Sequence, residues 1–117
     1  MAHEEELLQT MCVNWFKTNY SHLTKLLVHV ANERRCSIQR GALLRGMGVT
    51  PGVADLILFV ARQGFHGLCI EMKTPKGRQR DTQKDWQQQV EAQGYKYIIV
   101  RDFRDFCHQI TAYLETN

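Results

Sequence analysis

Three side chains that could do chemistry stand at the ends of two apolar segments. Asp55 opens the run DLILFVA, while Glu71 and Lys73 close the run that ends in CIEMK. Alternate residues of a strand share one face, so Glu71 and Lys73 are predicted neighbours on the same face. A carboxylate and an ammonium placed together at the end of a buried strand suggest a site rather than core.

The segment between the two runs sets how they face each other. Arg62-Gln63-Gly64 predicts a three-residue hairpin loop with its glycine in the left-handed conformation. Ala61 then pairs with Phe65, and equal steps outward bring Asp55 opposite Glu71. Directly opposed side chains have Cβ atoms about 5 Å apart. Two carboxylates that close repel unless a cation lies between them. A change of one residue in the loop would break this geometry.

Magnesium suits such a pair, because it is a hard cation that binds one or two carboxylates together with water and phosphate. Lys73 could hold or help deprotonate an attacking water, or neutralise charge on a phosphate. Three cations follow at Lys76, Arg78 and Arg80, where a phosphate backbone would lie. Gln83, at the start of the next helix, is predicted to face the sheet and order a water or a ligand oxygen. Together these residues predict metal-assisted hydrolysis of a phosphodiester.

Each of these features also has a purely structural explanation. Asp55 could cap the turn at Gly52-Val53. Glu71 and Lys73 could form a salt bridge at the strand edge, and the basic loop could simply be solvated. Taken one at a time, the structural explanations are the commoner ones. They weaken when one hairpin face collects an Asp, a Glu and a Lys and a basic loop follows at once.

The elements that must position these residues follow from hydrophobic spacing. Helices are predicted over 5–20, 37–46, 81–94 and from 102 onward, and strands over 23–31, 55–61, 65–73 and 97–100. The first helix places Leu8, Met11, Cys12 and Trp15 at helical spacing, Asp81 and Asp102 are the predicted N-caps of the last two helices, and Gly94 is the predicted stop of the third. The order predicts an α/β layered domain with a small mixed sheet covered on both faces.

Composition narrows the class. A chain of 117 residues with 44% hydrophobic residues predicts a single compact domain over 1–117. Its net charge of +3 permits nucleic-acid binding without demanding it. No apolar run is long enough to cross a bilayer, and the acidic N-terminus does not read as a signal peptide. The four cysteines form no CxxC pair, which favours reduced, mostly buried thiols in a cytoplasmic protein.

Three stretches together resemble the VRR-NUC (virus-type replication-repair nuclease) family of the PD-(D/E)XK nuclease superfamily. They are GMGVTPGVADLILF, GLCIEMKTPKGRQRDTQKDW and GYKYIIV. The resemblance implies a restriction-endonuclease-like fold and a DNA endonuclease that depends on Mg²⁺ or Mn²⁺. It implies that Asp55, Glu71 and the backbone carbonyl of Met72 bind the metal and that Lys73 serves catalysis. Gln83 matches the glutamine of the family's Q-x-x-W helix start.

Two further positions bear on the resemblance: one is a predicted site residue and the other departs from the family pattern. A glutamate on the first helix often completes the site, and Glu5 is the predicted residue, with Glu6 and Gln9 as neighbours that could share the role. Ala54 departs from the family, which usually has proline before the aspartate. Proline would stiffen the backbone there but supplies no ligand, so activity is expected to survive.

The resemblance also implies partners. Stand-alone members this short look like bacterial proteins, or viral proteins in a bacterial host. They act as homodimers on branched DNA such as Holliday junctions or flaps, and a replication or repair helicase is a further predicted partner. The alternative is a non-catalytic DNA-binding module derived from a nuclease fold. It would keep the predicted DNA-binding cations Arg40, Arg45, Lys76, Arg78 and Arg80 without using a metal.

Overall fold

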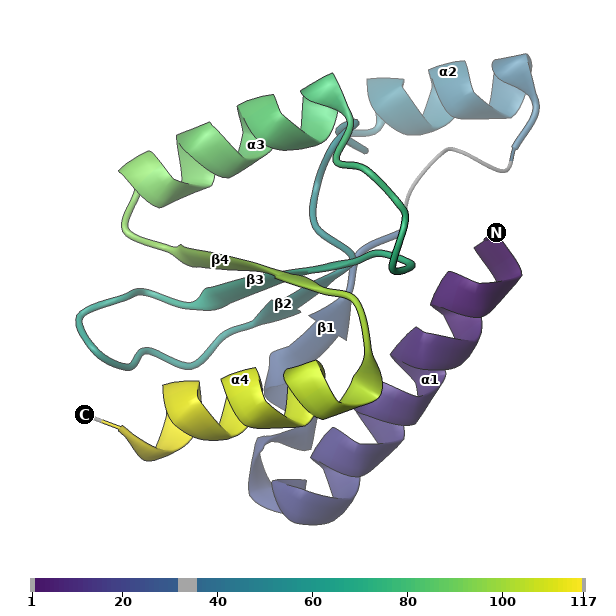
Figure 1. Cartoon of the computed structure of the whole chain (residues 1–117). Coiled ribbons are helices and arrows are strands. Elements are labelled where there is room, and N and C mark those ends of the chain that lie inside the picture. Colours follow the sequence, from purple (N-terminus) through teal and green to yellow (C-terminus); the bar gives the residue numbers. More distant parts are fainter. Residues whose placement is uncertain (1, 32–35, 117) are drawn as a thin grey trace.

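A computed structural model describes residues 2–31 and 36–116 as a four-stranded sheet with helices on both faces (Figure 1). The helices are α1 (Ala2–Asn19), α2 (Ile38–Gly46), α3 (Asp81–Ala92) and α4 (Phe103–Glu115), with a 3₁₀ helix η1 (Ser21–Leu26). The strands are β1 (Leu27–His29), β2 (Leu56–Leu58), β3 (Leu68–Met72) and β4 (Lys96–Val100). Their order is β1-β2-β3-β4, antiparallel except for the parallel pair β3 and β4. The predicted mixed α/β sheet is confirmed.

The two faces of the sheet are covered by different helices. Helices α1 and α4 lie on one face and α3 lies on the other (Figure 1). Leu68, Ile70 and Met72 of β3 pack with α1 and α4 in the main core, whereas Cys69 packs toward α3. The alternation predicted for β3 is therefore confirmed.

The hairpin between β2 and β3 differs from the predicted loop. Arg62 pairs with Phe65, so the loop is the two residues Gln63 and Gly64, with φ of 56° and 83°. Positive φ at both positions is the type I′ conformation that suits a two-residue hairpin. Between this bridge and the Leu58–Leu68 pair, residues 59–61 face only 66 and 67, so β2 carries a bulge. The extra residue restores the predicted register at the far end.

The first three strands are shorter than predicted, and the predicted cap of α3 was wrong. Residues 23–26 form part of η1 rather than a strand, where the Leu23 amide donates to the Tyr20 carbonyl. Asp81 is the first helical residue of α3 rather than its cap, because Arg80 occupies the extended N-cap position. The Asp102 cap is confirmed, since its carboxylate accepts from the Asp105 amide at 2.7 Å.

The core of α1 is shifted by part of a turn from the predicted face. Cys12 and Phe16 are fully buried, while Met11 is 52% exposed. Leu8 and Trp15 pack against the core as expected.

All four cysteines are free. Cys12 and Cys69 are buried, and burial raises the pKa of each thiol to about 12. Cys36 and Cys107 are only partly buried, so half of the predicted burial is confirmed. Among the helices that the structure describes, none has the length and apolarity that a membrane span needs.

Candidate active site

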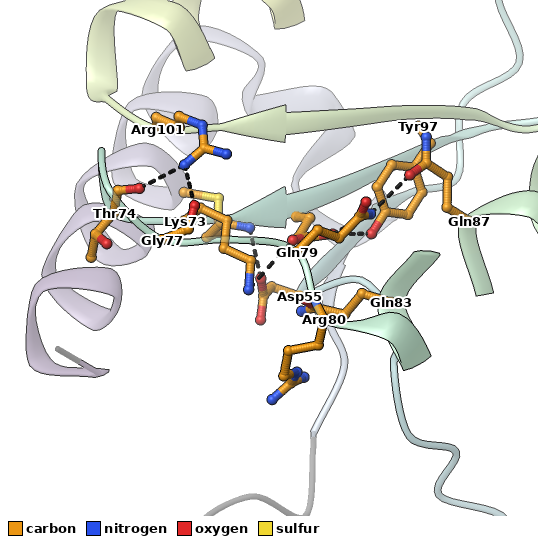
Figure 2. Close-up of polar contacts among 12 residues, drawn as sticks. Asp55, Lys73, Thr74, Gly77, Gln79, Arg80, Gln83, Gln87, Tyr97 and Arg101 are labelled. Atoms are coloured by element: carbon orange, nitrogen blue, oxygen red, sulfur yellow. Dashed lines mark hydrogen bonds and ion pairs between the residues drawn. The ribbon is translucent and has the colours of Figure 1, made fainter. Parts of the chain in front are cut away.

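The structure brings Asp55 to the end of β3, as the predicted register requires. Leu56 pairs with Ile70, so Asp55 lies one step beyond, opposite Glu71. The Asp55 carboxylate Oδ2 accepts a hydrogen bond from the Met72 amide at 2.7 Å (Figure 2). This bond extends the contact between the two strands beyond Leu56, the first residue of β2. It also holds one carboxylate oxygen against the strand that carries the other acid.

Glu71 is the most deeply buried charged side chain of the described residues, with an exposed fraction of 0%. Its Oε1 accepts hydrogen bonds from the Tyr97 hydroxyl and, at 3.1 Å, from the Gln79 amide. Its Oε2 is buried and has no hydrogen-bond partner. A buried acceptor left in this way costs about 1–3 kcal/mol, and more when charged, so such an atom indicates a missing ligand or a catalytic role.

Lys73 supplies the nearest cation. Its Nζ lies 3.5 Å from Glu71 Oε2, and the side chain is only 5% exposed. The Lys73 amide donates to the Val100 carbonyl at 2.9 Å, which fixes the backbone beyond β3 against β4. A buried ion pair is worth little net stability, because desolvation offsets most of the attraction. The pair therefore invites a functional explanation.

Tyr97 lies on the neighbouring parallel strand, on the same face as Glu71. Burial, followed by the hydrogen bond to Glu71 and the charge of Glu71, raises the pKa of the Tyr97 hydroxyl well above its usual range. The hydroxyl therefore stays protonated and remains a donor at any working pH. The Tyr97 ring packs beside the Trp86 ring of α3, with ring centroids 6.1 Å apart.

Gln83 is buried, as predicted, but its carbonyl oxygen serves the helix. That oxygen accepts from the Arg80 amide at 2.8 Å, closing the first turn of α3. This hydrogen bond uses one of the two lone pairs of the oxygen, so a role for Gln83 in ordering a water or ligand oxygen stays a prediction. The neighbouring Thr82 carbonyl lies against Gly52, where φ is +86° and an added Cβ would collide with it. The segment before Asp55 thus packs closely against the start of α3.

The basic loop after β3 is held by an arginine from β4's end. The Arg101 guanidinium donates to the carbonyls of Thr74 at 2.9 Å and Gly77 at 2.6 Å (Figure 2). The three cations of this loop are all exposed: Lys76, Arg78 and Arg80. The clamp fixes the loop backbone while leaving the cationic side chains at the surface.

The other two predicted DNA-binding residues lie on α2. Ser37 caps this helix by accepting from the Arg40 amide at 3.0 Å, and both Arg40 and Arg45 are exposed. In Figure 1, α2 lies toward the same end of the molecule as the start of α3. The part of the preceding segment that includes Asn32 falls outside the described residues.

Gln9 of α1 is linked to Asp55 through His29 of β1. The His29 Nδ1 lies 3.0 Å from the Asp55 carbonyl and 3.1 Å from the Gln9 amide nitrogen. Glu5 instead lines a hollow of about 350 Å³ beside Thr74. No group of three His, Cys, Asp or Glu able to hold a metal occurs within residues 2–31 and 36–116. The structure thus does not join Glu5 to the two strand carboxylates.

Four contributors were not singled out from the sequence: Tyr97, Gln79, Gln87 and Arg101. Tyr97 had a signal, since a polar tip in the apolar run YKYIIV predicts a buried hydroxyl that needs a partner. The two glutamines and the arginine had none, because their contacts depend on how a loop folds back.

The donor set fits a divalent ion of the magnesium type. Asp55 and Glu71 offer carboxylate oxygens at one strand end, and Glu71 Oε2 is buried without a hydrogen bond. Magnesium usually takes one or two protein carboxylates and completes its shell with water and phosphate, so a third acid is not required.

Comparison with known proteins identifies the family and supports the fold. The sequence profile of the VRR-NUC domain matches residues 3–102. A solved structure described as a VRR_NUC domain protein is 25% identical, with a TM-score of 0.81, over 97% of this chain and 89% of that one. No curated protein matches the chain. The chain belongs to the VRR-NUC domain family and carries a nuclease-type, DNA-processing domain.

Proposed function

We propose that this chain is a divalent-metal-dependent endonuclease that hydrolyses phosphodiesters of branched DNA, such as Holliday junctions or flaps. The observation that carries the proposal is the state of Glu71. Its carboxylate is fully buried, one oxygen has no hydrogen-bond partner, and that oxygen lies 3.5 Å from Lys73 Nζ. A solely structural ion pair would gain from having that oxygen hydrogen-bonded.

Asp55, Glu71 and the backbone carbonyl of Met72 would hold Mg²⁺ or Mn²⁺. When bound, the ion polarises a phosphoryl oxygen and acidifies its water. The Met72 amide keeps Asp55 Oδ2 in place at 2.7 Å, so the acid is oriented before any ligand arrives. Such preorganisation lowers the cost of assembling the site.

Lys73 places a positive charge beside the position that a scissile phosphate would occupy. Its side chain is 5% exposed, and charges interact more strongly where water is excluded. The lysine would neutralise charge that develops on the phosphate, or hold the attacking water. The exposed cations Lys76, Arg78 and Arg80, with Arg40 and Arg45 on α2, would bind the phosphate backbone.

Branched DNA and a homodimer belong to the same proposal. A four-way junction is cut symmetrically, and two identical sites related by a two-fold axis suit two symmetric cuts. A net charge of +3 per chain is modest for a protein that grips a long duplex, and pairing two chains would double it. A replication or repair helicase stays a prediction from the family resemblance.

The decisive experiment is a cleavage panel. Duplex, flap, splayed-arm and four-way DNA are incubated with the protein in Mg²⁺, in Mn²⁺ and in EDTA. We expect cutting of branched substrates that needs the metal. Glu71→Gln and Lys73→Met should each lower cleavage by at least about 100-fold while circular dichroism shows a folded chain.

Lys96→Met is the matched control for the lysine. Lys96 is a partly buried lysine on the next strand, paired with Leu68 at the end of β3 away from Glu71. It should keep full cleavage. Metal-independent DNA binding with no cutting of any substrate would instead favour the non-catalytic module. A monomer by sedimentation that still resolves junctions would refute the dimer.

A further inference from the structure

Tyr97 and Gln79 converge on a single oxygen of Glu71. We infer that they are positioning residues: they hold Glu71 Oε1 and so direct Oε2 toward the bound metal. This inference rests on the proposed function, because it assigns the ligand oxygen of the same site. Neither residue would touch metal or substrate.

The two oxygens of Glu71 have opposite surroundings. Oε1 accepts from the Tyr97 hydroxyl and from Gln79 Nε2 at 3.1 Å, whereas Oε2 has no hydrogen bond. A carboxylate can rotate about its last bond, and two donors on one oxygen select one orientation. In that orientation Oε2 faces Lys73 Nζ at 3.5 Å. The site therefore presents one defined oxygen rather than two equivalent ones.

Gln79 is itself fixed from behind. Its Nε2 also donates to Gln87 Oε1 at 2.8 Å, and Gln87 Nε2 donates to Glu91 at 3.2 Å. The two hydrogens of the Gln79 amide are thus both used, which leaves one orientation for the group. The chain of side chains runs along α3 and ends at Glu71. Helix α3 therefore helps to orient the acid without contributing a ligand.

Tyr97 adds the second donor to the same oxygen. Its side chain is 8% exposed, and its hydroxyl donates to Glu71 Oε1. Groups that orient a metal ligand typically change metal affinity or activity by about 10–100-fold when removed. Tyr97→Phe deletes the donor and keeps the ring that packs beside Trp86.

Tyr113→Phe is the matched control. Tyr113 is also buried, at 1% exposed, and its hydroxyl donates to the Val60 carbonyl at 2.6 Å in the core beneath α4. Both substitutions remove one buried hydroxyl hydrogen bond and keep the aromatic ring. Only Tyr97 contacts Glu71.

The test measures Mn²⁺ binding without DNA, from the free-ion signal in electron paramagnetic resonance, and cleavage across a series of metal concentrations. We expect Tyr97→Phe to bind Mn²⁺ about 10-fold more weakly. Its cleavage should recover at high metal, whereas that of Lys73→Met should not. Gln79→Ala should show a smaller shift in the same direction, and it provides the answer if Tyr97→Phe does not fold. Tyr113→Phe should bind like the wild type.

Two results would overturn the inference, and they differ. If the wild type binds Mn²⁺ and cuts DNA while Tyr97→Phe and Gln79→Ala match it in both, positioning is refuted and the proposed function stands. If the wild type neither binds Mn²⁺ nor cuts any substrate, the proposed function fails and the inference fails with it. An equal loss of Mn²⁺ affinity in Tyr113→Phe would also count against a specific role for Tyr97.

Discussion

The two faces of the sheet are built for different tasks. Among the described residues, the core between the sheet and helices α1 and α4 contains fourteen buried residues, and the cluster on the α3 side contains three. The three buried polar or charged residues of the described chain, Glu71, Lys73 and Gln83, are on the α3 side or at its edge. The first face supplies burial, and the second accepts polar groups that cost stability.

Because the apolar core lies on the opposite face, its burial can offset the unfavourable free energy of burying Glu71. Burying an apolar side chain contributes about 1.5–3 kcal/mol, while a buried acid with an oxygen that lacks a hydrogen bond opposes folding. One strand, β3, serves both sides: Ile70 points into the main core, and Glu71 points toward α3. The rigid core therefore fixes the position of the acid on its reverse side.

The largest effect is expected from breaking the apolar face. Phe106 is fully buried on α4 and packs edge-on against Trp15 at 6.0 Å. Phe106→Ala should destabilise the chain by about 3–5 kcal/mol, because it leaves a cavity. Urea unfolding measures this loss. The chain that remains folded should bind Mn²⁺ as the wild type does, and weakened binding at a temperature where the fold persists would show that the faces are not separable.

A smaller effect is expected where the segment before β2 packs against the start of α3. Gly52→Ala combines a φ of +86° with a collision against the Thr82 carbonyl. We expect a loss of about 2 kcal/mol and reduced cleavage, since the start of α3 must move away from Asp55. Thermal unfolding and a cleavage rate measure both.

Gly48→Ala separates the two causes. Gly48 has a φ of +107° but no atom within 4 Å of an added Cβ, so it reports the backbone conformation alone. It should lose less stability than Gly52→Ala and keep its cleavage rate. Equal losses in stability and rate would remove the close contact from the explanation.

The smallest change in stability is expected from neutralising the site. Lys73→Met alone should destabilise the chain, because it leaves the Glu71 carboxylate buried without its cation. Adding Glu71→Gln removes that charge and keeps an oxygen for Tyr97 and Gln79. The double variant should be as stable as the wild type, or up to about 1 kcal/mol more stable, and inactive. A double variant less stable than Lys73→Met, measured in urea, would contradict a site that costs stability.

The sequence was sufficient for the layers and for the strand register, although the loop was wrong. Alternation along β3 predicted which residues face the core, and Asp55 was predicted opposite Glu71. The true turn has two residues instead of three, and a bulge in residues 59–61 compensates for the missing one. A bulge leaves no reliable mark in a sequence, so the agreement depended on two differences that cancel.

The partners of the acid were harder to predict. Gln79 lies in a loop that Arg101 holds through backbone carbonyl groups. Because every residue has a carbonyl group, the sequence does not indicate which ones Arg101 contacts. Glu5 was predicted from the family resemblance, which does not determine how α1 of this chain crosses the sheet. Charged residues in short-range patterns can be predicted, whereas contacts that depend on the relative placement of elements cannot.

The parallel pairing of β3 with β4 has a consequence for the time at which the site forms. The two acids lie on an antiparallel hairpin whose strands are close in sequence, but Tyr97 arrives 26 residues after Glu71. During synthesis the acids therefore leave the ribosome before the hydroxyl that donates to one of them, and parallel pairing across a helix is slow to form. The nascent chain thus carries Glu71 without its Tyr97 partner until β4 docks, so the proposed site is completed only as the sheet forms.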